Sequence, residues 1–260
     1  MRHDSDAEVQ DQIVERFRMH VLGRRPDLSR YNARHDGAEG DWLTVQMGLT
    51  VNGKNEPDFK GFEMKKASSK ITFGDWSPDV AVYHTRVRRS EMSRDEFLRV
   101  FGAVPSTTRG GGAGRFSWSG KVFPKVGSVN FAGQEMLVEE QGDIVILYRN
   151  VLDSRTATAV PAKFRAGEIC LARWTADHMR NRVESKFNVR GWFICQKTAD
   201  GTYARVVFGP KIDFACFIRL VRSGLVYCDC GMHMGNPRPY MTWRAAQSVW
   251  SGLAGLDAKT

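Results

Sequence analysis

The sequence predicts a mixed α/β (α+β) fold in which a central mixed β-sheet is flanked by helices. Apolar residues make up 42% of the 260 positions, which is enough for a sizeable buried core. Segments with helical apolar spacing alternate with short strand-like runs. Two pairs of these runs are joined by short polar turns, a pattern that predicts β-hairpins. Helices alternating with hairpins and single strands indicate helices packed on one sheet.

The N-terminal part is predicted to contain two helices and one strand. In residues 7–23 the apolar positions recur at four-residue steps and a glycine ends the pattern, which predicts a helix: Val9, Ile13, Phe17 and Val21, then Gly23. Residues 41–49 are expected to form a second, short helix that Gly48 closes. A strand is expected over residues 61–67.

The middle of the chain is predicted to contain a capped helix and a hairpin. Ser93 and Glu96 have the spacing of a capping box, so a helix is expected over residues 93–102, ending at a glycine. The runs at residues 135–140 and 143–150 lie on either side of a Gln-Gly turn. They are expected to pair as an antiparallel hairpin.

The C-terminal part is predicted to alternate helices and strands. A helix is expected over residues 175–187, with the threonine at its start as the N-cap. Residues 190–198 and 202–208 flank an Ala-Asp-Gly turn and predict a second hairpin. Residues 211–224 are expected to form a helix, and residues 225–235 a strand that runs into a glycine-rich loop.

The chain has no feature of a membrane or disulfide-rich protein. No apolar run reaches the length of a membrane span, and the start "MRHDSDAEVQDQ" lacks the apolar core of a secretory signal. We therefore expect a cytoplasmic protein with no membrane partner. The five cysteines are odd in number and loosely spaced, which does not indicate a disulfide framework. Cys228, Cys230 and His233 offer only three zinc ligands at irregular spacing, so buried reduced thiols are the favoured interpretation.

The chain is strongly basic, with a net charge of +9. Residues 86–125 contain nine Lys or Arg and three Asp or Glu, a local net charge of +6. Within this segment Arg109, Arg115 and Lys121 lie in a glycine-rich stretch with aromatic residues, a composition that suits phosphate and base contacts. The excess of positive charge points to a polyanion such as nucleic acid. A solvated flexible loop is the alternative for this stretch.

Three charged residues surround the start of the strand expected at residues 61–67. Side chains alternate along a strand, so Glu63 and Lys65 are expected on one face and Met64 on the other. Asp58 comes just before, and Gly61 lets the backbone bend between the two carboxylates. Two convergent carboxylates suit Mg²⁺, and an adjacent lysine can stabilise a developing oxyanion during phosphodiester hydrolysis. The alternative is an exposed Glu-Lys ion pair, which contributes only about 0–1 kcal/mol.

The segment "PDFKGFEMK", residues 57–65, resembles the PD-(D/E)xK nuclease motif. Its form is similar to that of the MvaI/BcnI group of type II restriction endonucleases, relatives of the mismatch-repair nickase MutH. Weaker likenesses, in "ITFGDWSP", "FLRVFG" and "FIRLVRSGLVYCDCGMHMG", extend over most of the chain. The resemblance implies a restriction-endonuclease-like fold with a single nuclease domain over residues 1–260. Within it, a catalytic lobe and a DNA-recognition lobe would lie around a DNA cleft.

The resemblance also implies a set of site residues. Asp58, Glu63 and the backbone carbonyl of Met64 would bind Mg²⁺, for which Mn²⁺ can substitute. Asp58, Glu63 and Lys65 would be the catalytic residues. Members of the group often have a helix glutamate near the site. This chain has Thr44 or Gln46 there, so an accessory ligand for a second metal is not expected.

Six residues are the candidates for DNA contacts. His233 lies where the group has a histidine-containing recognition loop, and histidine or arginine can donate to guanine in the major groove. Lys66 is interpreted as a phosphate contact. For the histidine of "VAVYHTRVRR", DNA contact and core packing are both open. The candidates are His233, Arg238, Lys66, Arg109, Arg115 and His84.

By resemblance the chain is a sequence-specific, Mg²⁺-dependent DNA endonuclease of a bacterial or archaeal restriction-modification system. It would act as a monomer on double-stranded DNA, nicking each strand in turn at a short pseudosymmetric site. A cognate DNA methyltransferase is the expected functional partner. Two alternatives remain open: a strand-specific nickase of the MutH type, and a DNA-binding module with a decayed nuclease site.

Overall fold

The chain folds as two compact units. The structure, a computed structural model, describes residues 4–31, 37–83, 90, 92–104, 115–155 and 160–255. Unit 1 comprises Met1–Ile71, Arg182–Asp213 and Ala245–Thr260, and unit 2 comprises Thr72–Asn181 and Phe214–Arg244. Among the described residues, no helix is long and apolar enough to cross a membrane. Whether the units are a catalytic and a recognition lobe of one nuclease domain stays a prediction.

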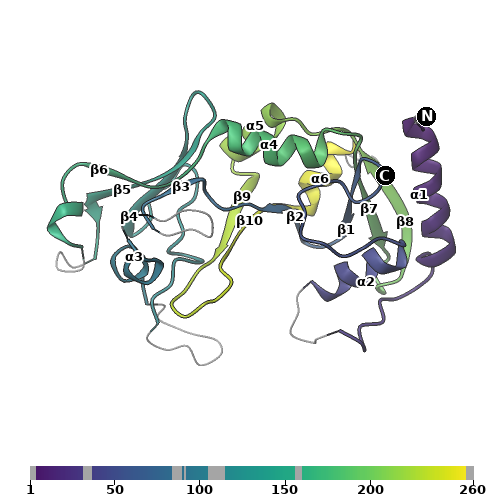
Figure 1. Cartoon of the computed structure of the whole chain (residues 1–260), viewed down its shortest axis with the longest axis horizontal. Coiled ribbons are helices and arrows are strands. Elements are labelled where there is room, and N and C mark those ends of the chain that lie inside the picture. The colour runs from purple at the N-terminus through teal and green to yellow at the C-terminus, as the bar shows by residue number, and fades with distance from the viewer. Residues whose placement is uncertain are drawn as a thin grey trace. The chain divides into compact units, whose positions relative to one another are not determined.

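Unit 1 is built on a mixed three-stranded sheet with the order β1-β7-β8 (Figure 1). Strand β1 (Phe62–Lys66) pairs in parallel with β7 (Gly191–Lys197), so that Met64 lies beside Phe193. Strand β8 (Tyr203–Gly209) pairs with β7 in the antiparallel direction. Because β1 is at the edge of this sheet, no strand in the described ranges pairs with the other side of its backbone.

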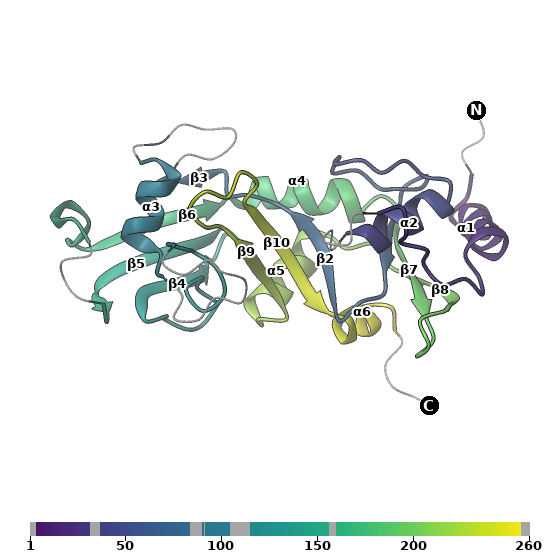
Figure 2. The same ribbon diagram turned by 90° about the horizontal axis from the view of Figure 1, so that it is seen from below.

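Helices cover the sheet of unit 1. Helix α1 (Asp6–His20) lies along β8, and α2 (Ala38–Gln46) contacts β1 (Figures 1 and 2). Helix α4 (Ala176–Phe187) ends in this unit, and α6 (Gln247–Leu253) follows the last strand. The apolar stripe expected on the first helix is buried together with the core face of the sheet: Val9, Ile13, Phe17, Val21, Trp42, Leu43, Met47, Phe59, Phe62, Met64, Phe193, Cys195 and Tyr203.

Unit 2 contains most residues of two further sheets. One has the order β3-β6-β5-β4, all antiparallel, with strands at Val80–Ala81, Glu168–Trp174, Ile144–Asp153 and Ala132–Val138. The other has the order β2-β10-β9, with strands at Lys70–Asp75, Tyr240–Ala246 and Val226–Gly231. Among the described residues, this unit contains α3 (Arg94–Phe101), a 3₁₀ turn (Ala162–Phe164), the first half of α4 (residues 176–181) and α5 (Phe214–Arg222).

Aromatic side chains fill the core of unit 2. Phe101 of α3 packs edge-on against Tyr148 of β5, with ring centroids 5.1 Å apart, which holds the helix on the sheet. Trp118 is fully buried, and its indole N–H donates to Gln134 at 2.7 Å. That hydrogen bond satisfies two polar groups that would otherwise be costly to bury.

The mixed α/β class is confirmed, and most predicted elements are present. Ser93 and Glu96 form the expected capping box of α3, and Thr175 accepts a hydrogen bond from the His178 N–H at the start of α4. Both predicted hairpins form, as β4-β5 and β7-β8. The strands that the structure describes are divided among three sheets rather than gathered in one. The sequence analysis did not predict strands β2, β3, β6 and β10 or helix α6. Of these, β2 pairs with β10, and β3 with β6, across long separations in sequence.

Candidate active site

A tight turn within the PDFKGFEMK segment comes directly before β1. Phe59 and Phe62 exchange backbone hydrogen bonds of 2.9 and 2.8 Å, and the two residues between them, Lys60 and Gly61, have φ values of 44° and 95°. Two positive φ angles are typical of a two-residue hairpin turn. A Cβ on Gly61 would come within 2.9 Å of Val189. The geometric requirement for glycine at this position is therefore confirmed.

Strand alternation places Glu63 and Lys65 on one face of β1, as expected. Phe62 and Met64 point to the opposite face and are part of the core of unit 1. The face with Glu63 is not open, however: only 2% of Glu63 is exposed, and Lys65 is also largely covered. The end of α4 lies against this face, because Lys186 contacts Glu63 and Phe187 contacts Lys65. The two charges therefore face a water-poor site rather than solvent.

Asp58 lies at the free edge of β1. Its Oδ2 accepts a hydrogen bond from the Met64 backbone N–H at 2.9 Å. Burial, together with the negative charge of Glu63, raises the pKa of Asp58 to about 6, while the Met64 N–H and two lysines oppose this shift. Two carboxylates that destabilise each other's charge in a buried place are typical of a cation site.

Two lysines converge on one carboxylate oxygen. Glu63 Oε1 lies 2.7 Å from Lys65 Nζ and 3.1 Å from Lys186 Nζ. The Lys65 ammonium also lies 5.2 Å from the centre of the Phe187 ring, within cation-π range. Burial lowers the pKa of Lys65, although Glu63 opposes the shift. Sequence reasoning missed Lys186. It predicted the helix correctly, but no local pattern connects its last turn to β1.

The other carboxylate oxygen of Glu63, Oε2, is suited to bind a metal ion. Glu63 Oε2 is buried and has no hydrogen-bond partner among the residues that the structure describes. An unpartnered carboxylate oxygen inside a protein is unfavourable unless a ligand completes it. Within those described ranges no cluster of three or more His, Cys, Asp or Glu is present, so the candidate site has two carboxylates. One or two carboxylates are the protein ligands that Mg²⁺ commonly takes.

Lys66 lies on the opposite face of β1 from Glu63. It is 3.4 Å from Glu39 of α2, and the same carboxylate binds Lys197 at 2.6 Å and the Tyr203 hydroxyl at 2.9 Å. This cluster fixes α2 on the sheet. The helix carboxylate beside β1 is therefore Glu39, a residue that the sequence reading did not single out. Because Glu39 contacts Lys66, strand alternation separates it from Glu63. Among the described residues no group of three His, Cys, Asp or Glu side chains could hold a metal ion, so Glu39 does not join Asp58 and Glu63 as a third ligand.

The other DNA-contact candidates belong to unit 2 or lie outside the described residues. The Nδ1–H of His233 donates to the Met234 carbonyl at 2.9 Å, and the His233 backbone forms a β-bridge with Ser117. Arg238 and Arg115 are exposed. Arg109 and His84 lie outside the described residues. DNA contacts by all of these residues stay predictions.

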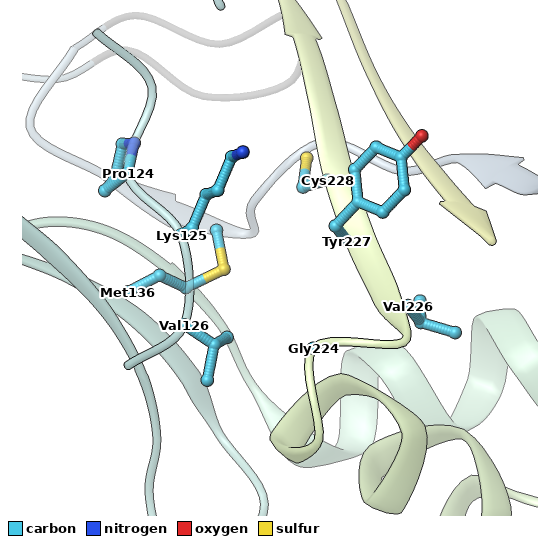
Figure 3. A pocket seen from close by; sticks show the side chains of 8 residues that line it. All are labelled: Pro124, Lys125, Val126, Met136, Gly224, Val226, Tyr227 and Cys228. Carbon is cyan, nitrogen blue, oxygen red and sulfur yellow. The ribbon is translucent and has the colours of Figure 1, made fainter. Parts of the chain in front are cut away.

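Unit 2 also contains a small pocket of about 120 Å³ (Figure 3). Most of its side chains are apolar, and it has one lysine and no carboxylate, so it does not suit a divalent cation. It lies between the loop at residues 124–126, strand β4 and the first residues of β9. Its lining residues are Pro124, Lys125, Val126, Met136, Gly224, Val226, Tyr227 and Cys228.

Comparison with known proteins decides the family. The family model described as LlaMI restriction endonuclease matches residues 22–256, nearly the whole chain. The chain belongs to the LlaMI restriction endonuclease family. The type II restriction enzyme ScrFI of Lactococcus lactis subsp. cremoris is 39% identical over 264 residues, covering 94% of this chain and 96% of the relative.

A solved structure supports the fold assigned to this LlaMI-family chain. The restriction endonuclease MvaI in a complex with its cognate DNA substrate aligns with a TM-score of 0.60 at 10% identity, covering 97% of each chain. At that identity the match shows the fold alone. The resemblance drawn from PDFKGFEMK is thereby confirmed. So is the expectation of an enzyme, a type II restriction endonuclease. The roles of individual site residues remain to be proposed from the geometry.

Proposed function

We propose that this restriction endonuclease hydrolyses DNA with Mg²⁺ bound by Asp58, Glu63 and the Met64 backbone carbonyl, with Lys65 as the catalytic lysine. The observation that carries the proposal is the clustering of Asp58, Glu63 and Lys65 at one end of β1, where the buried Glu63 Oε2 has no hydrogen-bond partner among the described residues. In the ion-pair alternative raised by the sequence, Glu63 and Lys65 would be exposed. They are buried instead.

The backbone of β1 supports Met64 as a ligand. The Met64 N–H donates to Asp58 at the free edge of the strand, and the N–H and C=O of one strand residue point to the same side. The Met64 carbonyl therefore points toward the edge where Asp58 lies. Mg²⁺ there would lower the pKa of a water molecule and neutralise charge on the phosphate.

The proposed catalytic role of Lys65 is supported by the surroundings of its side chain. Its ammonium lies beside Glu63 in a poorly hydrated site, where a hydrogen bond to a developing oxyanion is stronger than in water. Lys65 would orient the attacking water and stabilise the pentavalent phosphorus. In-line attack would leave a 5′-phosphate and a 3′-hydroxyl, and Asp58 and Glu63 would remain ionised throughout.

Unit 2 is the proposed source of sequence recognition. His233 and Arg238 would contact bases, and Arg115, Arg109, Lys66 and His84 would contact the DNA backbone or bases. A monomer has one copy of the Asp58 site, so cutting both strands requires two successive nicks. The proposed enzyme would therefore act on a short pseudosymmetric site as a monomer, one strand at a time, and a methyltransferase would protect the host DNA.

A plasmid cleavage assay tests the proposed chemistry. We expect supercoiled DNA with Mg²⁺ to become nicked and then linear, and Asp58→Asn to reduce the rate by at least about 10³-fold while specific DNA binding persists. Glu56→Gln is the matched control, because Glu56 is an exposed carboxylate of the same loop. It should cut like the wild type.

The pattern of products separates the alternatives. Nicks that never become breaks would indicate a strand-specific nickase, and no cleavage on varied DNA substrates would indicate a binding module. An Asp58→Asn enzyme that still cuts would show that the metal site is misplaced. Sequencing the product ends would give the recognition sequence and the cut position.

A further inference from the structure

The two lysines that contact Glu63 come from different secondary-structure elements. Lys65 comes from β1 itself, two residues after Glu63, whereas Lys186 comes from the last turn of α4. Both ammonium groups bind the same oxygen, Oε1, and both side chains are largely buried, with 11% and 16% exposed. Glu63 Oε1 therefore has two cationic partners, while Oε2 has none among the described residues.

The last turn of α4 is held in place by the loop that carries Asp58. The Asn55 side-chain amide donates to the Arg182 carbonyl at 2.8 Å and to Ser185 Oγ at 2.9 Å. Phe187 is fully buried beside Lys186. Lys186 thus has a defined position next to Glu63, and it is not a mobile surface lysine.

The contact between Lys186 and Glu63 explains how Lys65 can leave Glu63 during the proposed reaction. To act on water or phosphate, Lys65 must give up at least part of its 2.7 Å contact with Glu63 Oε1. A buried carboxylate oxygen that loses its only partner is strongly unfavourable, so such a carboxylate would retain Lys65. With Lys186 on the same oxygen, Glu63 Oε1 stays paired after Lys65 turns away.

We propose that Lys186 is a positioning residue that keeps Glu63 Oε1 paired and so releases Lys65 for the substrate. The proposal rests on the proposed function of Asp58, Glu63 and Lys65. It assigns Lys186 no contact with DNA and no part in building the cation site. Its effect on cleavage passes through Lys65 alone.

Single-turnover cleavage with saturating enzyme tests this role. We expect Lys186→Met to slow cleavage by about 10- to 100-fold, as partners of ligating side chains typically do. Lys186→Arg, which keeps a cationic donor, should recover most of the rate. In a Lys65→Met background, adding Lys186→Met should change the rate by no more than about twofold, because residues that act as one unit are not additive. Lys211→Met, at an exposed lysine of unit 1, is the control.

Metal binding without DNA gives a second measurement that does not depend on activity. Calorimetric titration of Mn²⁺ into Lys186→Met should show an affinity equal to or greater than that of the wild type, because a nearby positive charge has been removed. Glu63→Gln should lose binding. Thermal unfolding would check that each variant is folded, and Lys186→Gln, whose amide still donates, replaces Lys186→Met if that variant is not.

Three results would overturn the proposal: wild-type cleavage by Lys186→Met, multiplicative effects of the two lysine substitutions, or loss of Mn²⁺ binding by folded Lys186→Met. The first would make Lys186 irrelevant to the rate, the second would give it an independent role, and the third would make it part of the cation site. Failure of the proposed function is distinguishable, because then the wild-type enzyme would cut no DNA or the Asp58→Asn enzyme would still cut it.

Discussion

Asp58 carries its negative charge in an unfavourable place when no cation is bound. Burial and the charge of Glu63 outweigh the Met64 N–H and the lysines, and the pKa of Asp58 rises from 3.8 to about 6. A cation bound beside both carboxylates would offset the cost of burying the Asp58 charge and its repulsion by Glu63. The carboxylate that we propose as a metal ligand is therefore expected to destabilise the metal-free protein, a trade between activity and stability that is common at active sites.

The stability of the metal-free enzyme should depend on Asp58 and on pH. Between pH about 4 and 6 the folded protein keeps a proton on Asp58 that the unfolded chain has released, so wild-type stability falls as pH rises through this window. Asp58→Asn lacks this penalty. We expect it to be more stable than the wild type at pH 8 in EDTA, by on the order of 1–3 kcal/mol, and to lose most of this advantage at pH 4.5. Urea unfolding at the two pH values measures it.

Glu56→Gln serves as the control for this stability measurement, since it neutralises an exposed carboxylate nearby. It should give a much smaller difference at either pH. If Asp58→Asn were less stable than the wild type at pH 8, the charge of Asp58 would be favourable in the metal-free protein, and the proposed repulsion by Glu63 would be wrong.

At the scale of elements, the turn before β1 sets the distance between the two carboxylates. Lys60 and Gly61 reverse the chain, so that Phe59 and Phe62 pair and Asp58 returns to the edge of β1 beside Met64. The turn is therefore part of the site, although neither of its central residues contacts a reacting group.

A substitution at the turn should damage both stability and metal binding. In Gly61→Ala the new Cβ would combine a φ of 95° with contacts of 2.9 Å to Val189 and 3.1 Å to Arg190. We expect a loss of about 1–3 kcal/mol in the free energy of unfolding, and weaker Mn²⁺ binding because Asp58 is displaced. Gly53→Ala is the matched control in the same loop, since its φ is not positive and nothing lies within 4 Å. Equal effects of both substitutions would contradict the role of the turn.

The sequence predicted those features that depend on interactions between residues close together in the chain. The capping box of Ser93 and Glu96 and the alternation of Glu63 with Met64 depend on neighbouring residues, and the structure has both. The parallel pairing of β1 with β7 depends on segments far apart in the chain, and so does the arrival of Lys186 at Glu63. The three acidic and basic residues of the motif could therefore be predicted as a group, whereas Lys186 and the burial of the site could not.

At the scale of the whole molecule, positive charge is the feature that bears on DNA. The net charge of +9 attracts any duplex regardless of its sequence, and this attraction weakens as salt replaces the condensed counterions. Some of the basic residues are already paired within the protein: Arg173 lies between Glu139 and Asp143, and Lys197 contacts Glu39. Net charge therefore does not equal the number of phosphate contacts, which has to be measured.

The salt dependence of DNA binding measures that number. We expect the logarithm of the association constant for a non-specific duplex to fall linearly with the logarithm of KCl concentration, with a slope of about −0.9 for each phosphate contact. The Asp58→Asn enzyme, which we expect not to cut, would allow binding to be followed without cleavage. Arg115→Ala should make the slope shallower by about one contact, because Arg115 is an exposed arginine of the basic segment. Arg25→Ala, at an exposed arginine paired with Asp200, should leave the slope unchanged.

A slope near zero would mean that the charge of the molecule does not contribute to DNA binding. An unchanged slope in Arg115→Ala would remove this residue from the proposed phosphate contacts.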